Sequence, residues 1–231
     1  MTNNKNGKKN ELMKYKTEII KELNVKNDIF AKVQIIGDTQ VGKTSFLSKL
    51  TTNNFPEKYQ PTIGYEFTPY IIKINEKIIK FQLWDMCGNE NYRSVIFNLY
   101  RNASLGILIY SICSRNSYNN LEKWISKLKK YAAPWNKLIL VGNKCDNDDK
   151  REVTFEEGKR ICDKFNLLFF METSAKDGFN ISKILESAAI YLYEDYEKNN
   201  KTEINNLSTT LTTESILLKT STFKTKNKNC C

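Results

Sequence analysis

Between about residue 30 and residue 199, short apolar runs alternate with segments whose apolar residues recur every three or four positions. Runs of this length predict strands, whereas a spacing of three and four predicts helices. The run from Leu105 to Ile112 is almost continuously apolar, as expected of a strand buried in a parallel sheet. The other expected strands are Ala31 to Ile36, Glu66 to Ile74, Ile78 to Trp84, Lys137 to Val141 and Leu167 to Met171.

Helices are expected between most of these strands. Thr154, followed three residues later by Glu157, forms a capping box that predicts a helix through Phe165. The other expected helices are one from about Gly42 to Leu50, one marked by Leu121, Trp124, Ile125 and Leu128, and one marked by Ile181, Ile184, Leu185, Ala188 and Leu192. The turn at Asn75-Glu76 indicates a hairpin. Together these elements predict an α/β fold with three layers, in which helices flank a six-stranded, mostly parallel sheet.

The two ends of the chain are polar. Residues 1–29 are rich in Asn and Lys and are interpreted as a flexible extension, in which a short amphipathic helix around Lys14 to Leu23 is possible. Residues 200–231 are rich in Thr, Ser, Asn and Lys and cannot bury enough apolar surface to fold alone. One folded domain, residues 30–199, is therefore expected between two tails.

The chain is basic, with a formal net charge of +10 and a pI of about 9.2. This balance indicates either a polyanionic partner, such as nucleic acid, a phosphate ligand or an acidic membrane, or simply a solvated lysine-rich surface. The second interpretation is favoured, because the lysines are scattered and mixed with acidic residues.

Several kinds of chemistry are excluded by composition. The 231 residues include no His, and the six Cys form no C-x-x-C pair, so a zinc site and catalysis by His are not expected. No signal peptide and no apolar run long enough to span a membrane are found. The four internal Cys are therefore interpreted as reduced thiols of a cytosolic protein.

The strongest motif is a phosphate-binding loop. Residues 37–44 match G-x-x-x-x-G-K-S/T, after an apolar strand and before a helix. In such a loop the backbone N–H groups surround phosphates, Lys43 adds a cation, and the Thr44 hydroxyl reaches Mg²⁺. The motif alone indicates a nucleoside triphosphate, and leaves a kinase, an ATPase or a GTPase open.

A second motif selects the base. Asn143-Lys144-Cys145-Asp146 comes just after an expected strand. A carboxylate at Asp146 can accept both the N1–H and the exocyclic amine of guanine, whereas adenine would leave it unpaired. A third segment, Glu172 to Lys176, follows the last expected strand. Three signals in this order at strand ends indicate a guanine-nucleotide site.

These motifs resemble those of the Ras superfamily over about residues 30–199, and within it the Rab family. Trp84 to Glu90 resembles the Rab sequence W-D-T-A-G-Q-E, and Thr62 to Phe67 resembles T-I-G-V-D-F. Asn143 to Asp146 and Glu172 to Lys176 match N-K-x-D and E-T-S-A-K, and the double Cys terminus is a further Rab feature. The resemblance implies the P-loop GTPase fold and GTP/GDP with Mg²⁺ as ligands.

The resemblance also implies roles for single residues. Thr44 and Thr62 would coordinate Mg²⁺, Asp85 would hold it through water, and Gly88 would donate its N–H to the γ-phosphate. Lys43, Thr62, Gly88 and Asn89 are accordingly the expected catalytic residues. The expected nucleotide-binding residues are Gly37, Asp38, Thr39, Gln40, Val41, Gly42, Lys43, Thr44, Ser45, Phe55, Thr62, Asp85, Gly88, Asn143, Lys144, Asp146, Ser174, Ala175 and Lys176. For Phe55, contact with the base and burial in the core are both open.

The sequence departs from the family at Asn89, where relatives have the Gln that orients the attacking water. Asn is one methylene shorter, and a misplacement of about 1 Å can cost about a hundredfold in rate. Slow intrinsic hydrolysis is one expectation; the other is that Asn89 is tolerated, because activating proteins can supply an arginine and a glutamine. Thr39 and Gln40 also occupy positions where relatives have small residues.

The resemblance implies a set of partners: a nucleotide exchange factor, a GTPase-activating protein, an escort or GDP-dissociation inhibitor, and effectors. Effectors would contact Phe67, Trp84 and the two switch loops, which are the loops that Thr62 and Gly88 would anchor. Leu99 stands where a third aromatic residue is usual. Effector identity therefore cannot be taken from the family. No nucleic acid partner is expected.

At the C-terminus, Cys230 and Cys231 follow three lysines, and the resemblance implies that both carry geranylgeranyl chains. Two lipid chains give a stable anchor, where one is marginal. The alternative is a pair of unmodified thiols. The expected location is the cytoplasmic face of an intracellular membrane, with cycling through the cytosol. The apolar cluster Ile216-Leu217-Leu218 either docks on an escort protein or is incidental.

Two functions remain in competition. The first is a GTP-hydrolysing switch that regulates vesicle traffic. The second is a nucleotide-loaded recruiter that hydrolyses little, which Asn89 and Thr39 favour. A small-metabolite kinase is disfavoured because no acceptor site or Arg-bearing lid is found.

Overall fold

The computed structural model describes residues 15–56, 62, 65–86, 103–131 and 137–200. The chain divides into two units, residues 1–190 and residues 191–231. In the second unit the described residues, 191–200, are helical.

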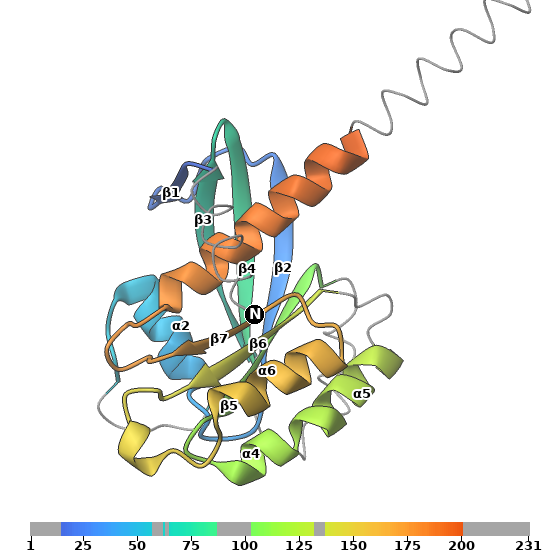
Figure 1. Ribbon diagram of the computed structural model, residues 1–231. Coiled ribbons are helices and arrows are strands. Elements are labelled where there is room, and N and C mark those ends of the chain that lie inside the picture. The colour runs from blue at the N-terminus through green and yellow to red at the C-terminus, as the bar shows by residue number, and fades with distance from the viewer. Residues whose placement is uncertain (1–14, 57–61, 63–64, 87–102, 132–136, 201–231) are drawn as a thin grey trace, which may run out of the picture. The chain divides into compact units, whose positions relative to one another are not determined.

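A single seven-stranded sheet forms the centre of the first unit (Figure 1). In spatial order its strands are β1 (Thr17–Ile20), β3 (Tyr65–Ile74), β4 (Lys77–Met86), β2 (Ile29–Ile36), β5 (Leu105–Ser111), β6 (Leu138–Asn143) and β7 (Phe170–Thr173). The five strands from β4 to β7 along this order are parallel, while β3 pairs antiparallel with both β4 and β1. The mostly parallel α/β architecture expected from the sequence is confirmed.

The described helices of this unit are α2 (Lys43–Thr52), α4 (Arg115–Asn119), α5 (Leu121–Tyr131), α6 (Phe155–Lys164), the short 3₁₀ helix η2 (Asp148–Lys150) and a helix over residues 181–190. Helix α6 begins with the expected capping box. The Thr154 hydroxyl accepts a hydrogen bond from the Glu157 N–H at 3.2 Å, and the Glu157 carboxylate accepts one from the Thr154 N–H at 2.9 Å. Both otherwise unpaired amide groups are thus satisfied at the helix start.

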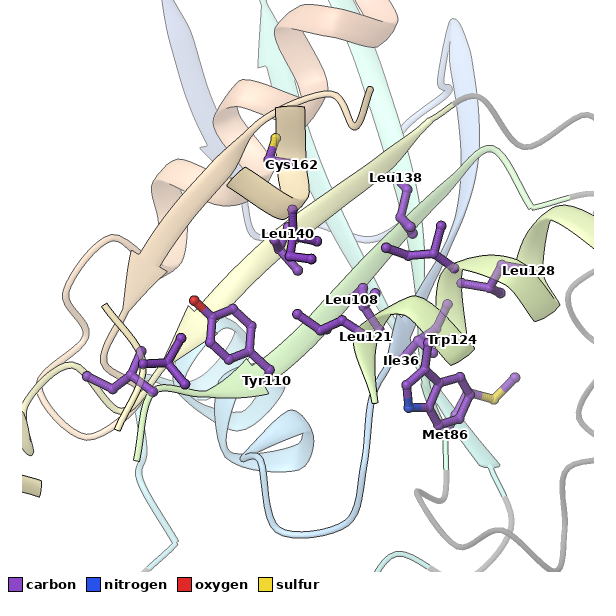
Figure 2. Close-up of a cluster of buried hydrophobic side chains, with 14 residues drawn as sticks. Ile36, Met86, Leu108, Tyr110, Leu121, Trp124, Leu128, Leu138, Leu140 and Cys162 are labelled. Carbon is purple, nitrogen blue, oxygen red and sulfur yellow. The ribbon is translucent and has the colours of Figure 1, made fainter. Parts of the chain in front are cut away.

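Helices α5 and α6 pack on one face of the sheet through a shared apolar cluster (Figure 2). Leu121, Trp124 and Leu128 lie on one side of α5, and they meet Leu108 of β5 and Leu138 of β6. Other members of the cluster are Ile36, Met86, Tyr110, Ile112, Ile125, Leu140, Val153, Ile161 and Cys162. Burial of these side chains is the main favourable contribution to placing α5, and it brings the first turn of α5 beside the end of β2.

The N-terminal segment differs from expectation. Residues 17–20 form the edge strand β1 instead of part of a helix, with Ile20 opposite Ile71 and Thr17 opposite Ile74 on β3. Four residues are too few to show whether the apolar spacing is that of a helix or a strand. This segment is a strand because the open edge of β3 offers it backbone hydrogen-bond partners. This strand also explains why the sheet has seven strands and not six.

In the portion of the chain that the structure covers, no helix is both long enough and apolar enough to cross a membrane.

Candidate nucleotide-binding site

The loop of residues 37–42 connects β2 to α2 in a conformation that requires glycine at two points. Gly37 has φ of 144°, and a Cβ there would lie 2.1 Å from the carbonyl oxygen of Ile109. Gly42 has φ of 95°, and a Cβ there would lie 2.4 Å from Nδ2 of Asn143. Gly42 is also the N-cap of α2 and offers no side-chain cap, so the first-turn N–H groups face outward, as an anion-binding helix start requires.

Lys43 lies almost entirely buried behind this loop, with 7% of its surface exposed. Its ammonium group donates hydrogen bonds to the carbonyl oxygens of Gly37, at 3.0 Å, and Asp38, at 2.6 Å. Burying a cation is costly unless negative charge is near. The phosphates of a nucleotide would supply that charge at the same place.

Three oxygen-bearing side chains converge at the start of α2. The Thr44 hydroxyl lies 2.8 Å from the Thr62 hydroxyl and donates a hydrogen bond to Oδ2 of Asp85 at 2.6 Å. The Thr62 hydroxyl donates to the same oxygen at 3.3 Å. Hard oxygen ligands of this kind suit Mg²⁺, which keeps several waters and binds few protein groups.

Asp85 provides the test of whether these residues fit a cation. The side chain is only 6% exposed, and its second oxygen, Oδ1, is buried without a hydrogen-bond partner. Burial raises the pKa of this carboxyl group, against the opposing effects of the Thr44 hydroxyl, the Lys43 charge and the Thr62 hydroxyl. An unpaired buried carboxylate oxygen is costly, and a hydrated Mg²⁺ would satisfy it, so the residues present fit the ion.

The second motif lies where β6 ends. Asn143 is 1% exposed; its side-chain N–H donates to the carbonyl oxygen of Val41 at 2.9 Å, and its Oδ1 accepts from Thr173 at 3.2 Å and from the Ala175 N–H at 3.3 Å. Lys144 has φ of 71° and donates from Nζ to the carbonyl oxygen of Gln40 at 2.7 Å. The motif expected to select the base is therefore hydrogen-bonded directly to the glycine-dependent loop.

Asp146, the carboxylate expected to select the base, accepts a hydrogen bond from the third motif, Glu172 to Lys176. The Ser174 hydroxyl donates to Oδ1 of Asp146 at 2.8 Å and accepts from the Asp177 N–H at 3.0 Å. Ala175 is buried behind Asn143, while Lys176 is exposed. Residues from the ends of β2, β6 and β7 are thus brought together at the carboxyl end of the parallel strands, where open α/β sheets bind ligands.

Some expected residues lie apart from this assembly or outside the described residues. Phe55 is 42% exposed, which contradicts burial in the core and leaves contact with the base as a prediction. Thr39 and Gln40 are exposed on the loop, and Gln40 has φ of 62°. Gly88, Asn89, Leu99, Cys230 and Cys231 lie outside the described residues.

Two residues near the loop were not expected to belong to the site. Asn120 and Trp124, at the start of α5, donate hydrogen bonds to the two carboxylate oxygens of Asp38 at 2.7 Å and 2.8 Å. The helical spacing identified Trp124 only as a core residue. No local signal in the sequence places either donor beside Asp38, because that contact depends on how α5 docks.

A glycine-dependent loop at a helix start, a buried lysine and an oxygen-lined cation position define a P-loop nucleotide-binding protein. The sequence matches the Ras family over residues 32–194. It is 39% identical to the Ras-related protein Rab-11B of Dictyostelium discoideum over 175 residues, which are 76% of this chain and 79% of the relative. It is 40% identical to the Ras-related protein Rab-3C of Mus musculus over 159 residues, 69% of this chain and 70% of the relative.

The Ras-related protein Rab-3A of Homo sapiens is similar to the same degree, at 39% identity over 159 residues, or 69% of this chain and 72% of the relative. The chain therefore belongs to the Ras family, as a small GTPase of the Rab type. The edge strand β1 lies outside the family-matched region.

Proposed function

We propose that this protein is a GTP-binding and GTP-hydrolysing switch that regulates intracellular membrane traffic by recruiting effectors in its GTP form. The observation that carries the proposal is the bond from Asn143 to the Val41 carbonyl, with that from Lys144 to the Gln40 carbonyl. These contacts join the motif expected to select the base to the loop expected to bind the phosphates, as a single nucleotide site requires.

In this proposal each residue of the loop has a defined task. The N–H groups at the start of α2 and the Lys43 ammonium group bind the β- and γ-phosphates. Thr44, Thr62 and Asp85 would hold Mg²⁺, which would neutralise phosphate charge when bound. Thr62 contacts Thr44 and Asp85 through its hydroxyl, so loss of the γ-phosphate would release the segment that carries it.

Selection of guanine is assigned to Asp146. Its Oδ1 is oriented by Ser174, and the carboxylate accepts the N1–H and exocyclic amine of the base. Such a site binds a base that lacks these hydrogen-bond donors with much lower affinity, because the carboxylate would be left unpaired. In this proposal Phe55 contacts the base, and Ser45 and Lys176 complete the nucleotide contacts.

Effectors are proposed to bind an aromatic surface on β3 and β4. Trp84 lies between Tyr65 and Phe67, with ring centroids 5.5 Å and 5.3 Å away. Tyr65 and Phe67 are 53% and 51% exposed, and the Lys32 ammonium lies 4.9 Å from the Trp84 ring. Exposed aromatic groups of this kind are typical of binding surfaces.

The remaining partners follow from the Rab resemblance. An exchange factor, an activating protein and an escort or GDP-dissociation inhibitor would control the cycle. Geranylgeranyl chains on Cys230 and Cys231 would anchor the protein to the cytoplasmic face of an intracellular membrane, from which it cycles with the cytosol. The second candidate function is a nucleotide-loaded recruiter, because Asn89 stands where the water-orienting Gln is expected.

The identity of the nucleotide that copurifies with the full chain tests this proposal. Denaturation and chromatography are expected to release mainly GDP, at about one equivalent per chain. Mainly GTP would favour the recruiter, whereas adenine nucleotide would contradict the assignment of Asp146. The variant Asp146→Ala is the matched control, and it is expected to lose the guanine nucleotide while retaining its far-UV circular dichroism spectrum.

A further inference from the structure

The side chain of Asp38 is clamped at both carboxylate oxygens by one end of α5. Its Oδ1 accepts a hydrogen bond from the Trp124 indole N–H at 2.8 Å, and its Oδ2 accepts one from the Asn120 amide at 2.7 Å. Hydrogen bonds to an ionised acceptor are shorter and stronger than neutral ones. Two such bonds fix both rotatable bonds of the Asp38 side chain, and therefore restrict its peptide as well.

The backbone of the same residue contacts the phosphate-binding lysine. The Asp38 carbonyl oxygen accepts from the Lys43 ammonium group at 2.6 Å, which is shorter than the 3.0 Å bond to Gly37. A continuous set of hydrogen bonds thus runs from α5 through Asp38 to Lys43. If Asp38 turned away, Lys43 would lose the hydrogen bond to the Asp38 carbonyl.

The indole N–H is not required to hold α5 in place. Trp124 is 6% exposed and packs in the core together with Leu121, Ile125 and Leu128 of the same helix. An aromatic ring without a donor would keep most of that packing. The polar contact to Asp38 therefore has an effect on the phosphate loop that can be separated from its effect on stability.

We propose that Asn120 and Trp124 are positioning residues for the phosphate loop, which act through Asp38 to hold Lys43 and slow nucleotide release. This inference rests on the proposed function, since it requires that the loop bind a guanine nucleotide. The proposal also implies that displacement of α5 would weaken the hydrogen bonds to Asp38 and so weaken nucleotide binding. A protein that moved the first turn of α5 would accelerate release without touching the nucleotide.

The test is the release rate of fluorescently labelled GDP from the full chain with Mg²⁺ present. Trp124→Phe removes the indole donor, and Asn120→Ser replaces the amide by a hydroxyl one bond shorter, which draws the donor away from Asp38. Each is expected to raise the rate on the order of tenfold, the change that corresponds to one charge-assisted hydrogen bond. Asn119→Ser, at the neighbouring residue, is the matched control and is expected to leave the rate within twofold. Unchanged release in both donor variants would overturn the proposal.

Exchanging the hydrogen-bond donor and acceptor between residues 38 and 120 distinguishes a positioning role of Asn120 from a purely structural one. Asn120→Asp places a second carboxylate beside Asp38 and is expected to accelerate release most. Adding Asp38→Asn restores the hydrogen bond with donor and acceptor exchanged, so the double variant is expected to release GDP more slowly than Asn120→Asp alone. Failure of this rescue, in a variant whose thermal unfolding midpoint matches the parent, would overturn the proposal. A parent chain that binds no guanine nucleotide would instead refute the proposed function.

Discussion

The side-chain amide of Asn143 donates a hydrogen bond to the carbonyl oxygen of Val41, 2.9 Å away, and thereby joins the end of β6 to the phosphate loop. The same side chain accepts hydrogen bonds from Thr173 and Ala175. Replacement of Asn143 by Ala should leave three buried groups unpaired. We expect a loss of about 2 kcal/mol in the free energy of unfolding. Urea unfolding measures this change.

The same variant should also release GDP faster, because only the bond from Lys144 to the Gln40 carbonyl among the two described contacts would still join the end of β6 to the phosphate loop. The matched control is Asn147→Ala, four residues further on and outside the contact with Val41. A variant of Asn143 that unfolds and releases nucleotide like the parent chain would show that the bond to Val41 contributes nothing.

We expect hydrolysis to depend on the residue at position 89. Restoring the longer amide with Asn89→Gln is expected to raise the single-turnover rate of GTP hydrolysis, by up to about a hundredfold if the attacking water is misplaced in the parent chain. Rapid-quench measurement of phosphate release gives this rate. Asn91→Gln adds the same methylene two residues away and controls for the substitution itself. An unchanged rate in Asn89→Gln would contradict impaired intrinsic hydrolysis.

Stability in acid should depend on Glu157. Hydrogen bonds from Arg115, at 2.5 Å and 3.1 Å, and then from the Thr154 N–H, lower the pKa of Glu157 from its ordinary 4.5 to about 2. Because the folded-state pKa is the lower one, the carboxylate stabilises the fold above about pH 4.5, and this contribution is lost as the pH falls toward 2.

Glu157→Gln should therefore cost about 1 kcal/mol at pH 7 and progressively less below pH 4.5. Urea unfolding of the parent and the variant between pH 7 and pH 3 measures the difference. Glu156→Gln, which removes a charge from the same first turn of α6, is the control. A difference that stays constant with pH would show that the Arg115 contact is not the cause.

Removal of β1 should destabilise the sheet. Deleting residues 1–21 removes four cross-strand pairs with β3, among them Ile19 opposite Ile72 and Ile20 opposite Ile71. At up to about 1 kcal/mol for each pair, we expect a loss of about 2 kcal/mol in urea unfolding of the GDP-bound protein. Deleting only residues 1–14 is the control. Equal stability of the two truncated chains would contradict a stabilising role for β1.

The sequence predicted the parts of the structure that local signals determine. Local signals predicted the capping box of Thr154 and Glu157 at the start of α6. They also predicted that Gly37 follows β2. The end of β6 was placed too early, at Val141, because Gly142 and Asn143 have low strand propensity. They continue the strand by pairing with Tyr110 and Ser111 of β5.

What the sequence could not show depends on contacts between distant segments. β1 exists because β3 has an open edge, and the clamp on Asp38 exists because α5 docks with its first turn beside the loop. Neither relationship leaves a periodicity or a motif at the residues involved. Tertiary packing decides both, and this is also why Trp124 was identified as a core residue but not as a donor.

The placement of two of the three tryptophans gives the protein a pair of intrinsic fluorescent reporters. Trp124 is buried with its indole N–H on Asp38, so its emission depends on the state of the phosphate loop. Trp84 is half-buried among Tyr65, Phe67 and Lys32, so its emission depends on whether the aromatic surface is covered. Chains that keep only one of these indoles would allow nucleotide release and partner binding to be followed separately, without a label.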